Sequence, residues 1–383
     1  MNPRPRVLLV GPTPPPLHGP AIFTRMVLDS PVVRESVEVI HLDISDRRDL
    51  GNIGRLDLRN VRLALEHLAR AVSLCVRHRP DVVHVQPSQN ALAFLRDAGF
   101  ILAGWLTGAR VVTHLHGEAF GHFRAEAHPG VRLLIDAVHA RVSEAWVLGS
   151  DLRDRYAGLV SSDRIRVMPN GIPEAVRRGV EEAGARGGGG GEAGVLRVLH
   201  LGQLARSKGT DVVIRAAAEA RSRGVRLTLT LAGGWGSPEE ERVLGSLVDD
   251  VGGPWLERPG VVDGRVKSDL LARADVLALA SRFPPGEGQP LAILEALAAG
   301  VCVVATPRGA VPETLGRGTA GVLVDVDRGG SFAEALETLA RDPERRRALA
   351  AAGRRRFEEL YTEASCVDRL VDGFRGAAAR QPR

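Results

Sequence analysis

Short apolar segments alternate with longer segments of helical composition along most of the chain. Each short segment is a nearly continuous run of residues such as Val, Ile and Leu, which is typical of strands buried on both faces of a parallel sheet. Six of them occupy the first half, at residues 6–11, 37–43, 81–86, 109–116, 144–150 and 164–170. Six more occupy the second half, at residues 196–203, 227–234, 259–262, 275–281, 301–306 and 321–325. The pattern predicts an α/β fold with two similar parallel sheets, each covered by helices.

A glycine-rich segment, RRGVEEAGARGGGGGEAG at residues 177–194, interrupts the alternation. Consecutive glycines among charged residues cannot form a core, so the segment is typical of a connector. The predicted domains are an N-terminal Rossmann-like domain (1–176), the connector (177–194), a C-terminal Rossmann-like domain (195–357) and a C-terminal helix (358–383) able to pack back on the first domain. Ligands of doubly wound sheets lie at the carboxyl ends of strands, so we expect them in a cleft that the two domains face.

The composition is that of a globular protein, with 44% hydrophobic and 25% charged residues and a formal net charge of +5. The three cysteines lie far apart, without a CxxC pair or a histidine at ligand spacing, so neither a disulfide framework nor a zinc site is indicated. The N-terminus is too weakly apolar for a signal peptide, and no apolar stretch approaches the roughly 18 residues of a membrane span. We therefore expect a cytoplasmic protein.

Residues 47–79 form a basic segment with eight arginines and three acidic residues. This charge is compatible with peripheral contact with an anionic membrane, at its inner face. The alternative is a solvated helix face whose arginine stems lie on apolar surface. The segment has no aromatic residues on which single-stranded nucleic acid would stack, so nucleic acid is not an expected partner.

The first candidate for ligand chemistry follows the strand at 196–203, in the sequence LGQLARSKGTDVV. Gly202 ends the strand, and Lys208 comes just before a helix. Thr210 or Asp211 is the expected N-cap of that helix. Backbone N–H groups and the helix dipole favour an anion at such a place, although the spacing is not that of a P-loop. We predict that Lys208 contacts a phosphate; the alternative is a solvated loop lysine.

The second candidate is PPGEGQPLAILEALAAG at residues 284–300, in which two carboxylates flank a helix start. Pro290 suits the first turn, so Glu287 lies in the loop and Glu295 about one and a half turns inside the helix. The free amides at Gly288–Leu291 would hold a pyrophosphate, while Glu295 accepts hydrogen bonds from a ribose and Glu287 from a sugar. A nucleotide diphospho-sugar has this shape. The alternatives are a helix-dipole role for Glu295 and simple exposure for Glu287.

Two strand ends in the first half hold further candidates. The strand at 109–116 ends in HLHGEAF, where alternation places His114 and His116 on the same side. A metal pair, for which no third ligand is identifiable, and a core histidine bonded to the backbone are both open interpretations. The proline-rich loop after the strand at 6–11 does not match GxGxxG, but Asp43 ends the second strand as a ribose-binding aspartate would. An NAD(P)-dependent Rossmann oxidoreductase therefore stays as an alternative.

The motifs follow one another as PNGIP (169–173), LGQLARSKG (201–209), LAGGWG (231–236), the segment 274–306 and GAVPETL (309–315). In this order they resemble the retaining glycosyltransferases of family 4, the glycosyl transferases group 1. The resemblance implies the GT-B fold, which is two Rossmann-like doubly wound domains facing across a cleft. It also implies a nucleotide diphospho-sugar donor of the UDP or GDP type, no metal, no cofactor, and retention at the anomeric carbon.

The resemblance further implies roles for individual residues. In the family a lysine before the helix contacts the diphosphate, which matches Lys208. The first acid contacts the donor sugar and the second the ribose, matching Glu287 and Glu295. A strand-end histidine lies beside the transferred sugar, and we match it to His116 in preference to His114.

The predicted catalytic residues are accordingly His116, Glu287 and Lys208. The predicted donor-binding residues are Gly202, Gln203, Arg206, Gly288, Gln289, Pro290, Leu291 and Glu295. The acceptor-side loop is represented by His18 and Gly19. Gln203 stands where the family usually has arginine, so a positive charge on the diphosphate is either missing or supplied by Arg206. Cys302 stands where the family tends to have proline, and we expect it only to pack.

The expected function is transfer of a sugar to a sugar or lipid-linked acceptor, in polysaccharide or glycolipid assembly. The resemblance favours attack by the acceptor on the face that the leaving phosphate vacates, with that phosphate accepting its proton. A nucleotide-sugar epimerase with the same fold and a non-catalytic scaffold are alternatives, besides the oxidoreductase.

Overall fold

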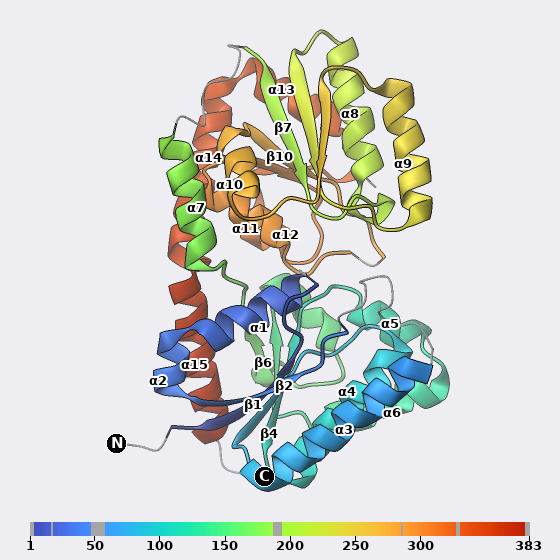
Figure 1. Ribbon diagram of the computed structural model, residues 1–383, viewed down its shortest axis with the longest axis vertical. Coiled ribbons are helices and arrows are strands. Elements are labelled where there is room, and N and C mark those ends of the chain that lie inside the picture. Colours follow the sequence, from blue (N-terminus) through green and yellow to red (C-terminus); the bar gives the residue numbers. More distant parts are fainter. Residues whose placement is uncertain are drawn as a thin grey trace. The chain divides into compact units, whose positions relative to one another are not determined.

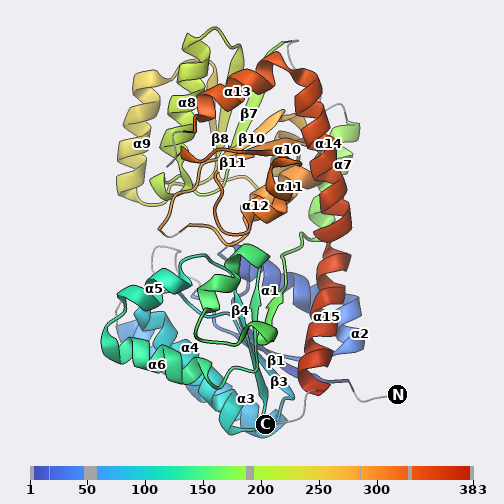
Figure 2. The ribbon, with the colours of Figure 1, turned by 180° about the vertical axis from the view of Figure 1, so that it is seen from behind.

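The computed structural model describes residues 4–16, 18–46, 58–186, 194–284, 286–326 and 330–379. The chain divides into two compact units, the first comprising Met1–Gly171 with Glu363–Arg383 and the second Ile172–Thr362. Each unit contains a six-stranded sheet in which every pair of neighbouring strands is parallel. Helices cover both faces of each sheet (Figure 1, Figure 2). The prediction of two doubly wound α/β domains is confirmed.

The strands of the first unit are β1 (Arg6–Gly11), β2 (Glu38–Asp43), β3 (Val82–Val85), β4 (Arg110–Leu115), β5 (Glu144–Val147) and β6 (Ile165–Val167). They lie in the order β2-β1-β3-β4-β5-β6. The chain builds the sheet outward from β1 in one direction and then from β3 in the other. Ligands of doubly wound folds bind at such a topological switch point, which here lies between β1 and β3.

The helices of the first unit are α1 (Gly19–Asp29), α2 (Pro31–Ser36), α3 (Leu58–His78), α4 (Ala91–Leu106), α5 (Phe120–Glu126), α6 (Pro129–His139) and α15 (Glu363–Ala379), with the 3-10 turns η2 (Ser150–Tyr156) and η3 (Ser162–Arg164). Helices α3, α4 and α6 cover one face of the sheet, and α1, α2 and α15 cover the other (Figure 1).

Helix α15 belongs to the first unit although it ends the chain. Its buried side chains recur at helical spacing, from Cys366 through Leu370 to Phe374, and they join the core formed by β1, β3 and β4. Gly373 lets the helix approach the sheet, because a Cβ there would lie 2.8 Å from Cζ2 of Trp146. The C-terminal segment therefore completes the first sheet's covering layer.

The strands of the second unit are β7 (Leu196–Leu201), β8 (Leu227–Ala232), β9 (Leu256–Gly260), β10 (Val276–Leu279), β11 (Cys302–Ala305) and β12 (Val322–Leu323). Their order is β12-β11-β10-β7-β8-β9, which places the switch point between β7 and β10. Cys302 lies buried in β11, where burial raises the pKa of its thiol to about 12.

The helices of the second unit are α7 (Glu174–Ala185), α8 (Thr210–Ser222), α9 (Pro238–Val251), α10 (Gly264–Arg273), α11 (Leu291–Ala298), α12 (Val311–Thr314), α13 (Phe332–Arg341) and α14 (Pro343–Leu360), with the 3-10 turns η4 (Arg206–Lys208) and η5 (Gly316–Gly318). Helices α8, α9 and α13 lie on one face of the sheet and α7, α10, α11 and α14 on the other (Figure 2). An apolar core fills each interface between sheet and helices.

The division between the units differs from the predicted domain boundaries. The first unit ends at Gly171 rather than 176, and α7 belongs to the second unit. Val180 of α7 is buried in the core on one face of the second sheet, and Arg186 pairs with Asp269 of α10 at 3.0 Å. Helix α7 therefore occupies much of the predicted connector 177–194, of which residues 187–193 lie outside the described residues.

One predicted strand is displaced. The apolar residues PGVV suggested a strand at 259–262, whereas β9 spans Leu256–Gly260. This strand lies at the edge of the sheet and is mostly exposed, and it includes Pro259. An exposed edge strand does not need a continuous apolar run, which explains the error. Among the described helices, none combines the length and apolar character required to cross a bilayer.

Candidate functional site

The candidate site of the second unit lies at the switch point of its sheet. Gly202 immediately follows β7, and the loop from Ser281 to Pro290 follows β10, the strand next to it. The two predicted motifs therefore meet at the carboxyl edge of the sheet, as expected for a doubly wound fold.

Lys208 and Glu287 form an ion pair in which Nζ lies 2.5 Å from Oε1. The hydroxyl of Ser281 donates to the same carboxylate oxygen at 2.8 Å. Both side chains are partly exposed, 28% for Lys208 and 13% for Glu287, so a ligand can reach them. The structure thus brings together two of the three predicted catalytic residues.

Close contacts between the backbones of two loops hold Lys208 at this position. Gly209 follows it with φ 69°, and a Cβ there would lie 2.0 Å from the carbonyl oxygen of Ala280, at the end of β10. The amide of Arg282 also donates to the carbonyl of Ser207 at 2.9 Å. Only glycine permits this conformation together with this contact. The loops after β7 and β10 are therefore fixed to one another.

The GAVPETL motif positions the loop of Glu287 in the same way. Gly309 has φ 54°, and a Cβ there would lie 1.8 Å from the carbonyl oxygen of Glu287. The amide of Ala310 donates to the carbonyl of Gly288 at 2.7 Å. Sequence reasoning assigned no role to Gly309, and its positive φ and close contact show that it supports the carboxylate loop.

Glu295 forms a second ion pair, which sequence reasoning missed. Nζ of Lys267, in α10, lies 2.7 Å from Oε1 of Glu295 in α11, and the Glu295 side chain is only 8% exposed. Lys208 and Lys267 are the two lysines of the chain, and each is held by one of the two motif glutamates. The scarcity of lysine was the available signal, but it does not reveal which partner each lysine has.

The other predicted donor-binding residues differ in exposure and in the partners of their side chains. Gln203 is exposed. Arg206 is engaged by two acids of α9, with its guanidinium 3.3 Å from both Glu239 and Glu240. The side-chain amide of Gln289 is buried and donates to the hydroxyl of Thr314 at 3.0 Å. Its side chain therefore secures α12.

Two expected helix starts are shifted by one residue. Pro290 is the N-cap of α11 rather than part of its first turn, so Leu291 is the first helical residue. Gly209, not Thr210 or Asp211, is the N-cap of α8. The left-handed conformation of Gly209 ends the preceding turn, and the Thr210 hydroxyl is used inside, where it accepts from the amide of Ala205.

In the first unit the predicted histidines form part of an aromatic cluster. The rings of His114 and His116 lie 4.3 Å apart between centroids, and Phe23 packs against both at 5.1 and 4.8 Å. Burial lowers the pKa of His114 to about 3, and Nε2 of this residue lies 3.2 Å from the carbonyl oxygen of Met168. His114 is therefore a core histidine bonded to the backbone.

His116 differs because it is only partly buried and faces a cavity. Burial, together with the neighbouring His114, His84 and His18, holds its pKa well below the usual value, so the imidazole is neutral at pH 7. His18 lines the same cavity, directly before α1, whereas Gly19 has open space around it. Within the described residues, no three metal-ligating side chains gather at these histidines or elsewhere.

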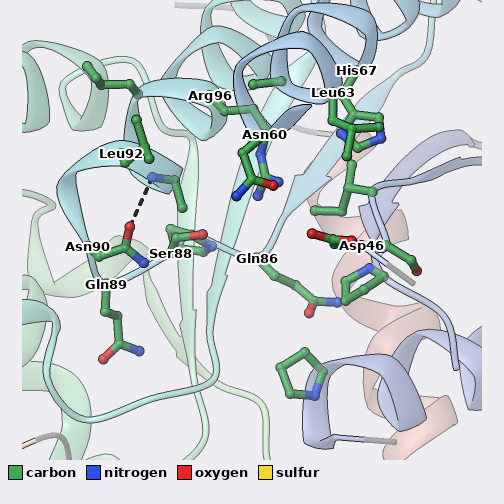
Figure 3. Close-up of a pocket in the computed structure, with 18 of the residues that line it drawn as sticks. Asp46, Asn60, Leu63, His67, Gln86, Ser88, Gln89, Asn90, Leu92 and Arg96 are labelled. Atoms are coloured by element: carbon green, nitrogen blue, oxygen red, sulfur yellow. Dashed lines mark hydrogen bonds between the residues drawn. The ribbon is translucent and has the colours of Figure 1, made fainter. Parts of the chain in front are cut away.

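The cavity has a volume of about 690 Å³, and all of its lining residues belong to the first unit. It lies at the carboxyl ends of β1–β4, beneath α3 and α4, so it includes the switch point of the first sheet. Figure 3 shows polar side chains such as Gln86, Asn60 and Arg96 spread around it.

Asp43, the residue behind the oxidoreductase alternative, is occupied within its own loop. Its carboxylate accepts hydrogen bonds from the hydroxyl of Thr13 at 3.1 Å and from the amide and hydroxyl of Ser45 at 2.9 and 2.5 Å. Burial acts to raise the pKa of this carboxyl, but these hydrogen bonds outweigh it and lower the pKa. The aspartate thus joins the loops after β1 and β2.

Comparison with known proteins assigns each unit to a related family model. Residues 196–342 match the model described as "Glycosyl transferases group 1", and residues 5–171 match "Glycosyl transferase 4-like domain". The first of these covers both lysine–glutamate pairs, and the second covers the histidine cluster and the cavity.

Relatives are similar over part of their length. The α-maltose-1-phosphate synthase of Mycolicibacterium smegmatis is 29% identical over 65% of this chain and 66% of its own. The D-inositol 3-phosphate glycosyltransferase of Pseudarthrobacter chlorophenolicus is 32% identical over 56% of this chain and 50% of its own. The chain thus spans about half to two thirds of the length of these curated relatives.

Among solved structures, HepE of Anabaena in complex with UDP and glucose has the same fold, with a TM-score of 0.70, 16% identity, and coverage of 97% of this chain and 100% of its own. The GT-B fold expected from the motifs is confirmed. Taken together, the two family models span most of both units, and the chain belongs to the glycosyl transferases of group 1.

Proposed function

We propose that this protein transfers a sugar from a nucleotide diphospho-sugar to a hydroxyl group of an acceptor. The observation that supports this most directly is the pairing of both lysines with both motif glutamates in the second unit. A diphosphate requires cations, and sugar hydroxyls require carboxylate acceptors. The two pairs provide both kinds of group.

In this proposal Lys208 is the cation for the diphosphate. Before the donor binds, Glu287 and Lys208 neutralise one another. A phosphate oxygen then replaces the carboxylate as the partner of Lys208, and Glu287 accepts hydrogen bonds from the donor sugar in place of the one from Lys208. Free amides at the start of α11 add donors to the diphosphate. Glu295 accepts from the ribose hydroxyls, with Lys267 keeping its carboxylate oriented.

We infer retention at the anomeric carbon from the family resemblance. The acceptor oxygen bonds to the anomeric carbon on the face from which the diphosphate departs, while the bond from that carbon to the phosphate oxygen breaks. The proton of the acceptor hydroxyl passes to the departing phosphate. Lys208 stabilises the charge on the leaving group, and His116 orients the sugar as a neutral hydrogen-bond partner.

We propose that transfer requires neither a metal ion nor a cofactor, because Lys208 and helix amides supply the neutralising charge. The UDP or GDP type of donor follows from the same resemblance. Transfer that continues in the presence of EDTA is the expected result. Loss of transfer in EDTA that added Mg²⁺ restores would contradict this part of the proposal.

The acceptor in this proposal is a sugar or a lipid-linked sugar, in polysaccharide or glycolipid assembly at the inner face of the membrane. The described part of the basic segment 47–79 is α3, while residues 47–57 lie outside the described residues. Helix α3 exposes Arg62, which pairs with Glu66 at 2.6 Å, and also the apolar side chains of Leu65 and Val76. Sedimentation with phosphatidylglycerol vesicles but not with phosphatidylcholine vesicles would support membrane contact, and equal partition would oppose it.

Thermal unfolding against a panel of nucleotide diphospho-sugars tests the donor proposal. A ligand that binds only the native state at a hundred times its Kd adds about 2.7 kcal/mol to stability. We expect at least one donor to raise Tm, Lys208→Ala to abolish this shift, and Arg242→Ala, on the exposed face of α9, to leave it unchanged. If none of the donors changes Tm, the proposal is refuted.

A further inference from the structure

The cavity of the first unit is lined mainly by apolar side chains where it runs between α3 and α4. Helix α3 contributes Leu63, Ala64 and Leu68, and α4 contributes Leu92 and Ala93. A sugar presents hydroxyl groups all round, and each would lose its hydrogen bonds to water in such surroundings. The part of the cavity between the helices is therefore suited to an apolar ligand.

Polar groups in the lining are concentrated on the strand ends. Gln86 and Gln89 follow β3, His116 follows β4, and His18 precedes α1. Figure 3 shows Gln86 and Gln89 on the side of the pocket away from Leu63 of α3. Since His116 is neutral, it offers a hydrogen bond without a charge, and Asp46, in the loop after β2, adds a carboxyl group to the lining. The cavity thus has one end for hydroxyl groups and another for hydrocarbon.

The few polar side chains contributed by the helices do not change this picture. The guanidinium of Arg96 is engaged by Asp97 at 2.9 Å and lies over the ring of Phe100. Burial, followed by the charge of Arg96, lowers the pKa of His67, so this imidazole is also neutral at pH 7. The helical part of the cavity therefore has no unpaired charge contributed by these two residues.

The mouth of the cavity is apolar as well. Val61, Leu65 and Leu95 line the cavity and are also 40%, 63% and 49% exposed. Exposed apolar side chains around an apolar pocket are typical of a binding surface, because a ligand that covers them removes apolar surface from water. A chain longer than the cavity is able to leave through this mouth over apolar surface.

We propose that this cavity binds an acyl or isoprenoid chain carried by the acceptor, with the acceptor's hydroxyl end at His18 and His116. The inference rests on the proposed function and names the chemical class of the acceptor. The two ends of the cavity match the two ends of such an amphiphile, and the exposed rim matches a chain that extends beyond the site.

The test uses n-alkyl β-glucosides with chains of four to ten carbons, below their critical micelle concentrations, and measures their binding to the full chain by calorimetry. Each methylene buried adds about 0.8 kcal/mol, so we expect affinity to rise about fourfold per methylene. Affinity that does not depend on chain length, or that stops rising at four carbons, would overturn the proposal.

Two matched substitutions on α3 locate the site. Leu65 and Val76 are 63% and 61% exposed, and Leu65 lines the cavity whereas Val76 does not. We expect Leu65→Asp to weaken binding of the ten-carbon glucoside at least tenfold and Val76→Asp to leave it unchanged. Ala64→Phe, which fills the cavity, is compared with Ala69→Phe at an exposed position. Equal effects within either pair would place the chain elsewhere and overturn the proposal.

The same samples separate this inference from the proposed function. Nucleotide diphospho-sugars bind the second unit in our proposal, so the shift in Tm that they cause should survive Leu65→Asp and Ala64→Phe. A donor shift without chain-length dependence defeats the lipid cavity alone. Chain-length dependence without any donor shift defeats sugar transfer, and with it the assignment of this lipid as an acceptor.

Discussion

Each unit buries a histidine on a central strand, but the two residues have different surroundings. His200 of β7 uses both ring nitrogens, since Nδ1 lies 2.9 Å from the carbonyl oxygen of Ala278 and Nε2 lies 3.0 Å from the hydroxyl of Thr210. His84 of β3 packs among Phe23, Phe374 and Trp146, and neither of its nitrogens has a hydrogen-bond partner within the described residues.

The same contrast holds at the candidate sites. In the second unit, charged groups are paired and held by backbone contacts, as in Lys208 with Glu287 and Lys267 with Glu295. In the first unit, the site has neutral imidazoles beside an apolar cavity. One kind of sheet thus supports two chemistries, one suited to an anionic nucleotide and the other to an uncharged, amphiphilic acceptor.

Breaking the Lys208–Glu287 pair should have the largest effect on turnover. Lys208→Ala removes the cation for the leaving group, and loss of one such stabilising group costs roughly 10²–10³-fold in rate. Glu287→Ala should have an effect of similar size, because the donor sugar loses its acceptor. Initial rates with the donor identified by thermal unfolding measure both effects, with Arg242→Ala as control. Unaltered turnover in either variant would remove that residue from the mechanism.

Gly309→Ala tests whether backbone contact holds the carboxylate loop. The new Cβ meets the carbonyl of Glu287, and the positive φ adds strain, so we expect a loss of about 3 kcal/mol in stability together with weaker donor binding. Gly300→Ala is the matched control, since Gly300 has φ 67° and nothing near its Cβ position. It should cost only about 1 kcal/mol. Urea unfolding measures both, and equal losses would show that the contact is unimportant.

The sequence predicted most of this architecture for a simple reason. Strands buried on both faces are largely apolar, as in β1, β10 and β11, which makes the central strands easy to locate. Eleven of the twelve predicted ranges contain an observed strand, whereas the range 259–262 only overlaps the exposed edge strand β9. The carboxylates of the second unit were visible because Glu287 and Glu295 lie on either side of a helix start. The GT-B fold followed from the order of the motifs.

The rest depends on contacts between distant residues. Lys267 is separated from Glu295 by 28 residues, and nothing in the local pattern of α10 indicates the pair. The cavity is formed by α3 and α4 together with four strand ends, so no single segment of the sequence predicts it. The boundary near Gly171 was missed because the glycine run 187–191 is conspicuous, whereas the packing of α7 on α10 is not.

The two buried histidines should respond differently to removal of their nitrogens. His200→Leu removes the hydrogen bonds of the ring to the Ala278 carbonyl and the Thr210 hydroxyl, which should cost about 2 kcal/mol at pH 7.5. His84→Leu removes two nitrogens that have no partner in the described part of the chain and should change stability by less than about 1 kcal/mol. Urea unfolding compares the two variants. A loss for His84→Leu as large as that for His200→Leu would erase the distinction between the units.

Lowering the pH should reveal the buried, neutral state of His84 through a smaller change in stability. Burial, followed by the neighbouring His114, holds the pKa of His84 well below 6.5, whereas an unfolded histidine titrates near 6.5. Below pH 6.5 the unfolded chain therefore binds a proton that the folded chain excludes, so stability is complete above this pH and falls as the pH decreases. The contribution of His84 is about 1.4 kcal/mol for a decrease from pH 7.5 to 5.5.

His84→Leu should lose that much less stability than the parent chain over this interval, measured by urea unfolding with tryptophan fluorescence. Identical losses in the parent and in His84→Leu would mean that His84 does not resist protonation in the folded chain, and the neutral character of the first unit's interior would then have to come from other groups.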